Sequence, residues 1–146
     1  MDATDLKIIK CLQKDARMSL KKISEKCFVS APTAAARIDH LQKNGVIRQL
    51  TATLNYPKLG YGIKAFVSLR LEPQDKAEFY PYIASFVNVA ACDCVTGYFS
   101  QIITCYFKKT TELDDFINEI QRFGETQTQI VFSTSVLPRE INVDQS

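Results

Sequence analysis

FVSAPTAAARIDHLQKNG, residues 28–45, predicts a short connection followed by an amphipathic helix. Ser30 is a good N-cap, because its hydroxyl accepts a hydrogen bond from a free backbone N–H of the first turn, and Pro32 is tolerated in that turn. Gly45 is a typical residue just past a helix end, so the helix should run to Asn44. The inward face comprises Ala34, Ile38 and Leu41.

Two further helices precede this stretch. The first begins at Asp2 or Thr4 and runs to about Lys14, and the second opens at Ser19. Two helices joined by a short turn, the later one capped by serine, are typical of a helix-turn-helix. We expect the first helix to bury Leu6, Ile9 and Leu12, and the second to bury Leu20, Ile23 and Cys27.

The apolar period changes to two after Gly45, so residues 46–54 predict one or two strands, the wing of a winged helix-turn-helix. Residues 55–62 are rich in Pro, Gly and Asn and predict a linker. The DNA-binding domain is therefore assigned to residues 1–54 and a second domain to residues 63–146.

The second domain alternates strands and helices in the order βαββαβ. Strands are predicted over 63–71, 89–95, 98–107 and 130–137, and helices over 75–86 and 111–123, the latter capped by Thr111 and Asp114. This α+β order is typical of a ferredoxin-like fold, a four-stranded antiparallel sheet with two helices on one face. Because the strands carry apolar residues on both faces, we expect a second copy of the chain to cover the open face.

Charge is distributed unevenly along the chain. Residues 1–60 hold 11 Lys and Arg against 5 Asp and Glu, whereas residues 61–146 hold 7 against 11. A basic half predicts a polyanionic partner, because Lys and Arg that neutralise phosphates dominate non-specific affinity for nucleic acids. Double-stranded DNA is the expected partner of the first half.

The outward face of the third helix carries the candidate DNA contacts. Arg37 is the one residue there able to bind guanine with two hydrogen bonds, while methyl groups suit thymine. The alternative is an ordinary solvated helix face. For His40 a phosphate contact and a solvent-exposed side chain are equally open. The candidate contacts are Lys21, Lys22, Ser30, Thr33, Arg37 and His40, with Arg17 and Lys26 as further phosphate contacts.

Several short segments carry a family resemblance over nearly the whole chain. They are Leu6-Lys7-Ile8-Ile9, Val29-Ser30-Ala31-Pro32-Thr33, Asn44-Gly45-Val46-Ile47-Arg48, Ala65-Phe66-Val67 and Val95-Thr96-Gly97. In this order and spacing the chain resembles the Lrp/AsnC, or feast-famine, transcriptional regulators. The resemblance implies DNA binding through the third helix, dimers that assemble into octamers, and a small effector, usually an amino acid.

The same resemblance places the effector at the loop after the second strand of the second domain. The family typically has an aspartate where this chain has Ser100, and a neutral hydroxyl is a weaker partner for a ligand ammonium than a carboxylate is. Either the ligand preference is altered or amino-acid sensing is lost. The expected effector contacts are Thr96, Gly97, Tyr98, Phe99, Ser100, Gln101, Ser133 and Ser135.

The remaining composition indicates neither a cofactor nor a metal centre. The five cysteines form no C-x-x-C pair. The only histidine, His40, lies in the other half of the chain from Cys92 and Cys94, so reduced structural thiols are expected. A redox-sensing role for Cys92 or Cys94 is the alternative. No apolar run reaches membrane-spanning length and the N-terminus is acidic, so we expect a cytoplasmic protein with no membrane partner.

Two rival functions stay open. Sirohaem decarboxylases share the two-domain shape, but no nucleophile–base pair is visible, so an enzyme is not expected. The other rival is an effector-independent architectural protein that compacts DNA, because the alanine-rich third helix offers few polar groups to base edges.

Overall fold

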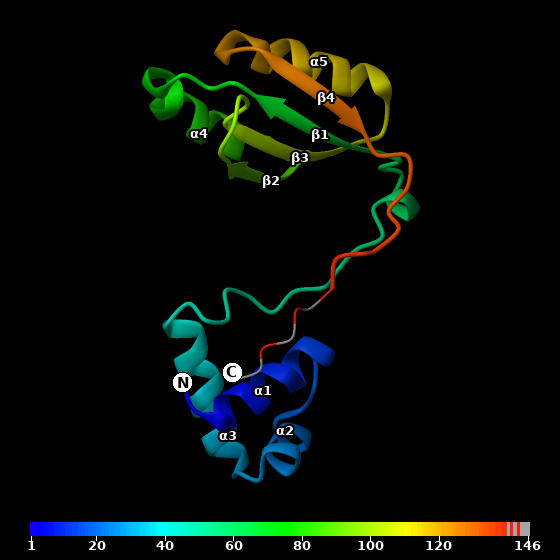
Figure 1. The fold of residues 1–146 in the computed structure, drawn as a ribbon. Coiled ribbons are helices and arrows are strands. Elements are labelled where there is room, and N and C mark those ends of the chain that lie inside the picture. Colours follow the sequence, from blue (N-terminus) through cyan, green and yellow to red (C-terminus); the bar gives the residue numbers. More distant parts are fainter. Residues whose placement is uncertain (140, 142, 144–146) are drawn as a thin grey trace. The chain divides into compact units, whose positions relative to one another are not determined.

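The computed structural model describes residues 1–139, 141 and 143. The contacts divide the chain into two compact units (Figure 1). The first contains Met1–Thr53 and the described residues from Leu137 onward, and the second contains Leu54–Val136. The chain after Leu137, expected in the second domain, thus groups with the first unit, because Val143 lies beside Met1 in an apolar groove.

The first unit contains three helices, α1 (Ala3–Lys14), α2 (Leu20–Cys27) and α3 (Ala31–Lys43). Each begins as predicted, because the side chains of Asp2, Ser19 and Ser30 accept hydrogen bonds from the backbone N–H groups of the first turn. Between α2 and α3 the chain turns sharply at Phe28, whose φ of 58° is left-handed. The predicted helix-turn-helix is confirmed.

The core of the first unit forms where the three helices meet. Ile8, Ile23 and Ala34 are buried completely or nearly so. The predicted stripe of α1 is wrong in part, because Ile8 replaces Leu6 and Ile9, which are only half-buried and line the apolar groove. Leu20 is also exposed, since it is the first residue of α2. The other core members are Leu12, Cys27, Ile38 and Leu41.

The predicted wing strand is absent. Within the described chain, residues 46–54 form no strand, and the one sheet consists of strands of the second unit. A strand needs a neighbouring strand for its backbone groups, and this segment forms a ladder with none in the described chain; Ile47 N–H bonds instead to Leu41 O at the end of α3 (3.1 Å). Its apolar side chains consequently stay exposed, among them Val46, Leu50 and Leu54.

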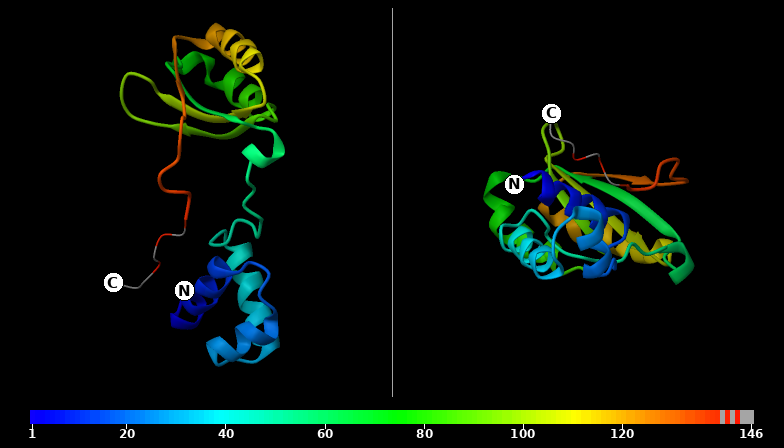
Figure 2. Two further views of the ribbon diagram at one scale, coloured as in Figure 1. Left: turned by 90° about the vertical axis from the view of Figure 1, so that its right-hand side faces the viewer. Right: turned by 90° about the horizontal axis from the view of Figure 1, so that it is seen from below.

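The second unit has the predicted ferredoxin-like order. Its elements are β1 (Ile63–Leu69), α4 (Lys76–Ala84), β2 (Val89–Cys94), β3 (Gln101–Phe107), α5 (Thr110–Ile120) and β4 (Thr126–Ile130). The strands form one antiparallel sheet in the order β2-β3-β1-β4, and both helices cover the same face (Figures 1 and 2). None of the helices described is long and apolar enough to span a membrane.

Alternation along the two central strands builds the core of this unit. On β1, Ala65, Val67 and Leu69 are fully buried, and the intervening residues are half-buried. The inward residues of β3 pack with them against Phe79 of α4 and Phe116 of α5. A strand buried on one face produces this period of two.

The last strand lies earlier than predicted. β4 ends at Ile130, whereas the sequence favoured 130–137, whose apolar Phe132 and Val136 prove exposed. Gly124 explains the shift, because its φ is +150° and a Cβ there would lie 2.1 Å from Arg70 O. The chain therefore approaches β1 directly after this glycine, and polar residues suffice for a half-exposed edge strand.

Two smaller expectations also fail. Glu112 caps α5 in place of Thr111 and Asp114, since its Oε2 accepts from the backbone N–H groups of Lys108 (3.0 Å) and Lys109 (3.3 Å). β3 begins at Gln101, so residues 98–100 belong to a loop and not to the strand.

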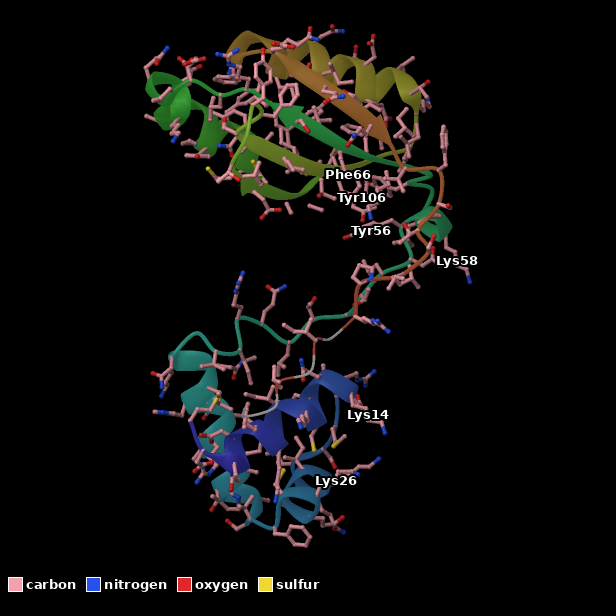
Figure 3. The ribbon with its side chains drawn as sticks, in the orientation of Figure 1. Lys14, Lys26, Tyr56, Lys58, Phe66 and Tyr106 are labelled. Atoms are coloured by element: carbon pink, nitrogen blue, oxygen red, sulfur yellow. The ribbon has the colours of Figure 1, made fainter. Side chains whose placement is uncertain are left out.

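The face of the sheet opposite the helices carries an aromatic cluster. Figure 3 shows Tyr56 against Tyr106, with Phe66 close by. The rings of Tyr56 and Tyr106 stack with centroids 4.4 Å apart, and Lys64 Nζ lies 5.3 Å from the centroid of Phe66. Tyr56 thereby joins the expected linker to the second unit.

Candidate functional site

Exposed basic side chains of α2 accompany the outward face of α3. Lys21, Lys22 and Lys26 are exposed on α2, and Arg17 is exposed in the turn before it. Figure 3 shows Lys26 projecting from α2. On α3, Thr33 and His40 are exposed, whereas their neighbours Ala34 and Leu41 are buried. Packing of the core thus leaves a face of small and polar residues exposed on α3, and the same unit exposes four cations on α2 and the turn before it.

Arg37 is not free on this face. Its Nη1 donates to Asp2 Oδ2 and to Asp5 Oδ1, both at 2.7 Å. The two carboxylates hold the pKa of Arg37 above its usual value. The pKa values of both aspartates are lowered, first by the backbone N–H that each accepts from the other residue and also by Arg37. Arg37 therefore ties α3 to the first turn of α1.

Two other candidate contacts are also engaged within the protein. Ser30 Oγ accepts from the backbone N–H of Thr33 at 3.1 Å and lies 2.7 Å from Thr33 Oγ1. His40 Nε2 lies 2.8 Å from Nδ2 of Asn44, one turn further along. Ser30 therefore orients the start of α3 through the cap.

The expected effector loop is held closely against the end of β1. Ser100 donates its backbone N–H to Leu69 O at 3.0 Å and accepts at its own carbonyl from Val95 N at 2.9 Å. Ser100 Oγ accepts from Leu71 N (3.1 Å) and donates to Leu71 O (3.3 Å). The hydroxyl of Ser100 is thus already bonded to the backbone of Leu71.

Tyr98 forms the exposed side of the same loop. Its hydroxyl accepts from Arg70 Nη1 at 2.9 Å and donates to Glu125 Oε2 at 2.7 Å. The guanidinium of Arg70 also lies 4.7 Å from the centre of the Tyr98 ring, and its pKa is raised, chiefly by the hydrogen bond with Tyr98. The ring of half-buried Phe99 meets Tyr98 edge-on. The loop therefore has the cation of Arg70 and the carboxylate of Glu125 beside its aromatic residues, and Glu72 Oε1 lies 3.7 Å from Arg70 Nε.

The remaining effector candidates differ in accessibility. Thr96 and Gly97 are exposed, and Gly97 has a φ of +116° that favours glycine. Gln101 is fully buried, where it accepts from Cys92 Sγ (3.7 Å) and donates to Tyr80 Oη (3.3 Å). Ser133 and Ser135 are exposed and lie beyond β4, so the expectation that they stand on the last strand is wrong.

The cysteine thiols are free, as the spacing predicts. Burial raises the pKa of Cys92 to about 11 and that of Cys105 to about 12. A thiol is a good nucleophile only as thiolate, so half-buried Cys92 has little of the character of a redox sensor. Among the described residues, no group of three or more His, Cys, Asp or Glu is arranged to hold a metal ion.

Sequence reasoning missed the partners of these side chains. Asp2 and Asp5 stand at the spacing of reciprocal capping, which is readable from the sequence, but their bond to α3 depends on how the helices pack. Arg70 and Glu125 lie far from Tyr98 in sequence, and the pairing of β1 with β4 brings them to it.

Comparison with known proteins agrees with both units. Residues 1–48 match a winged helix-turn-helix DNA-binding family, and residues 64–141 match the Lrp/AsnC ligand binding domain. The chain is 29% identical to the transcriptional regulator LrpC of Bacillus subtilis over 91% of this chain and 92% of that protein. It is 35% identical to the regulator PH0140 of Pyrococcus horikoshii over 91% of this chain and 87% of that protein.

Solved structures show the same arrangement. The structure of Bacillus subtilis LrpC aligns with a TM-score of 0.84 at 28% identity over 99% of both chains. The regulator NMB0573 of Neisseria meningitidis, solved as a complex with L-Met, has the same fold, with a TM-score of 0.82 at 23% identity over 94% of this chain and 96% of that one. The chain belongs to the Lrp/AsnC family and is a DNA-binding transcriptional regulator with a C-terminal ligand-binding domain.

Proposed function

We propose that two copies of the chain place α3 in the major groove of specific DNA sites, and that an amino acid or related metabolite modulates this binding. The observation that carries the proposal is that α3 keeps an outward face exposed and that Lys21 and Lys22 are exposed on the preceding helix α2. A recognition helix contacts bases from such a face, while neighbouring cations neutralise phosphates. In this proposal the protein is a cytoplasmic regulator and has no enzymatic activity.

The side chains divide into distinct roles under this proposal. Thr33 and the methyl of Ala36 contact base edges, and Lys21, Lys22 and His40 contact phosphates. Ser30 and Arg37 position α3 through the cap and through the bonds to Asp2 and Asp5. Arg37 is thus reinterpreted as a positioning residue.

A dimer follows from the open face of the sheet. Phe66, Ile102 and Tyr106 on that face are only partly buried in the isolated chain, and a second copy would cover them. We propose further that such dimers assemble into octamers and bend DNA around themselves. The sequence dependence of DNA bending would add specificity to a recognition helix that has few polar groups for base contacts.

The effector is proposed to bind at the loop of residues 96–101. Thr96, Gly97 and Tyr98 are its accessible members, with Arg70 beside them and Ser133 and Ser135 as further candidates. The L-Met complex of the Neisseria protein supports only that this fold accommodates an amino acid. Because the hydroxyl of Ser100 is already bonded to Leu71, an ammonium group must find another partner, and Glu125 is the nearest carboxylate bonded to the loop.

A second candidate function is architectural DNA binding without an effector. The polar groups of Ser30, Arg37 and His40 are all engaged within the protein, which leaves little for direct reading of bases. Binding would then depend on phosphates and on the deformability of DNA.

Two experiments separate these functions. Selection from a random duplex library yields a defined site if α3 reads bases, and no consensus if binding is architectural. Thermal unfolding with each of the twenty amino acids tests the effector, because a ligand at about a hundred times its Kd stabilises by about 2.7 kcal/mol. A selective shift that Gly97→Val abolishes supports the loop site, and no shift with any amino acid contradicts an amino-acid effector.

A further inference from the structure

A cavity of the ligand-binding unit lies apart from the loop of residues 96–101. It has a volume of about 470 Å³, within the usual range for small-molecule sites, and none of residues 96–101 lines it. Its walls come from α5, from the chain after α4, and from the end of β3.

The floor of this cavity is aromatic and rigid. Phe107 and Phe116 are almost fully buried, with ring centroids 5.5 Å apart, and Phe86 meets Phe116 edge-on at 5.1 Å. The two buried rings close the floor, and the aromatic area open to a ligand belongs to the partly exposed Phe86 and Tyr61.

The rim carries two opposite charges that are not paired with each other or with other ions. Lys108 Nζ lies over the ring of Tyr61, 5.0 Å from its centroid, and makes no ion pair with any described residue. Asp115 is exposed and has neither a hydrogen bond nor an ion pair within the described chain. The other two acids are engaged, Glu112 by backbone N–H groups and Glu119 by the Tyr82 hydroxyl at 2.6 Å.

We propose that this cavity binds a zwitterionic amino acid with an apolar side chain. Lys108 takes the ligand carboxylate, Asp115 takes its ammonium group, and the partly exposed ring of Phe86 receives its side chain above the buried floor. Both polar contacts are charge-assisted, the stronger kind of hydrogen bond. The site goes beyond the proposed function, which assigns the ligand to the loop of residues 96–101.

The net negative charge of the rim also determines which amino acids the cavity excludes. Glu112, Asp115 and Glu119 give three carboxylates against the single ammonium of Lys108. A second carboxylate on the ligand is repelled there, so acidic amino acids bind far more weakly than apolar ones.

Calorimetric titration of the full chain with L-phenylalanine and L-leucine tests the site, with L-glutamate as comparison. We expect Asp115→Asn and Lys108→Met each to weaken binding about tenfold or more. The matched controls are Asp114→Asn and Lys109→Met, exposed neighbours with the same charges that do not line the cavity. The controls should bind like the parent chain, and thermal unfolding checks that all four variants fold.

The outcomes separate this site from the loop. Loss of binding in Asp115→Asn, with Tyr98→Phe unaffected, supports the cavity. Loss in Tyr98→Phe with Asp115→Asn unaffected overturns the cavity and leaves the proposed function intact. Equal affinities of Asp115→Asn and Asp114→Asn, or no heat with either apolar amino acid, also overturn it.

Discussion

Arg37 Nη1 lies 2.7 Å from Asp5 Oδ1, so the recognition helix is bonded to the first turn of the helix that opens the chain. The same nitrogen donates to Asp2, whose side chain caps that helix. One guanidinium thus fixes the relative placement of α1 and α3. This contact makes Arg37 part of the scaffold that presents the DNA-binding face.

A double-mutant cycle tests this role. Arg37→Ala and Asp5→Asn should each lower the Tm of the first unit. The Tm of the double variant should fall by much less than the sum of the two single decreases, because both substitutions remove the same contact. Arg37→Lys should rescue the Tm only in part, since an ammonium lacks the planar fork. Losses that simply add would show that the two side chains do not interact in solution.

Acid should weaken the first unit through the same cluster. Asp2 and Asp5 have pKa values below the ordinary 3.8, first because each accepts the other's backbone N–H and also because of Arg37. A carboxyl group whose pKa is lower in the folded than in the unfolded state stabilises the fold at pH values above its unfolded-state pKa. This stabilisation is lost as the pH falls through the folded-state pKa. Unfolding followed from pH 7 to pH 2 should therefore show stability falling below about pH 4. The Asp5→Asn variant should show a shallower fall, and an identical profile would refute the assignment.

Salt dependence measures the proposed phosphate contacts. Each phosphate neutralised contributes about 0.9 to the slope of log affinity against log salt concentration. Lys22→Ala should reduce that slope by about this amount on specific and random DNA alike. Lys109→Ala, which removes an exposed lysine of the second unit, is the control and should leave the slope unchanged. An unaltered slope in Lys22→Ala would remove this lysine from the interface.

Gly124 should tolerate no side chain. A Cβ would meet Arg70 O at 2.1 Å, and the φ of +150° already strains any other residue. We expect Gly124→Ala to destabilise the second unit by more than about 2 kcal/mol, measured by denaturant unfolding. Gly62→Ala, with open space around the added carbon, is the control and should cost far less.

Local patterns predicted the helices well. Ser19 and Ser30 cap as expected, and the buried positions of α3 follow its helical period, because both signals depend on neighbours in sequence. The order of the second unit was also readable, since its central strands alternate cleanly between a buried and an open face.

The failures share a physical cause. The stretches 46–54 and 131–137 look like strands, but neither forms a ladder with a described strand, and Val131 N–H alone continues the contact with β1, at Lys64 O (2.8 Å). Conversely, Thr126 and Gln127 form an edge strand despite their polarity, because Gly124 brings the chain against β1. The bonds of Arg37 to Asp2 and Asp5 could not be predicted, because these partners lie more than thirty residues away in sequence, while its contact with DNA stays a prediction.

Sequence-specific binding through α3 is the central claim, and the affinity ratio between a selected duplex and its scrambled version tests it most directly. At fixed salt the parent chain should prefer the selected duplex by about a thousandfold or more. Ala36→Glu, which puts a carboxylate on the proposed contact face, should abolish binding to both duplexes. Ala84→Glu, at an exposed helical position of the other unit, should keep the preference. Equal affinity of the parent chain for the two duplexes, or unchanged binding in Ala36→Glu, would contradict the account.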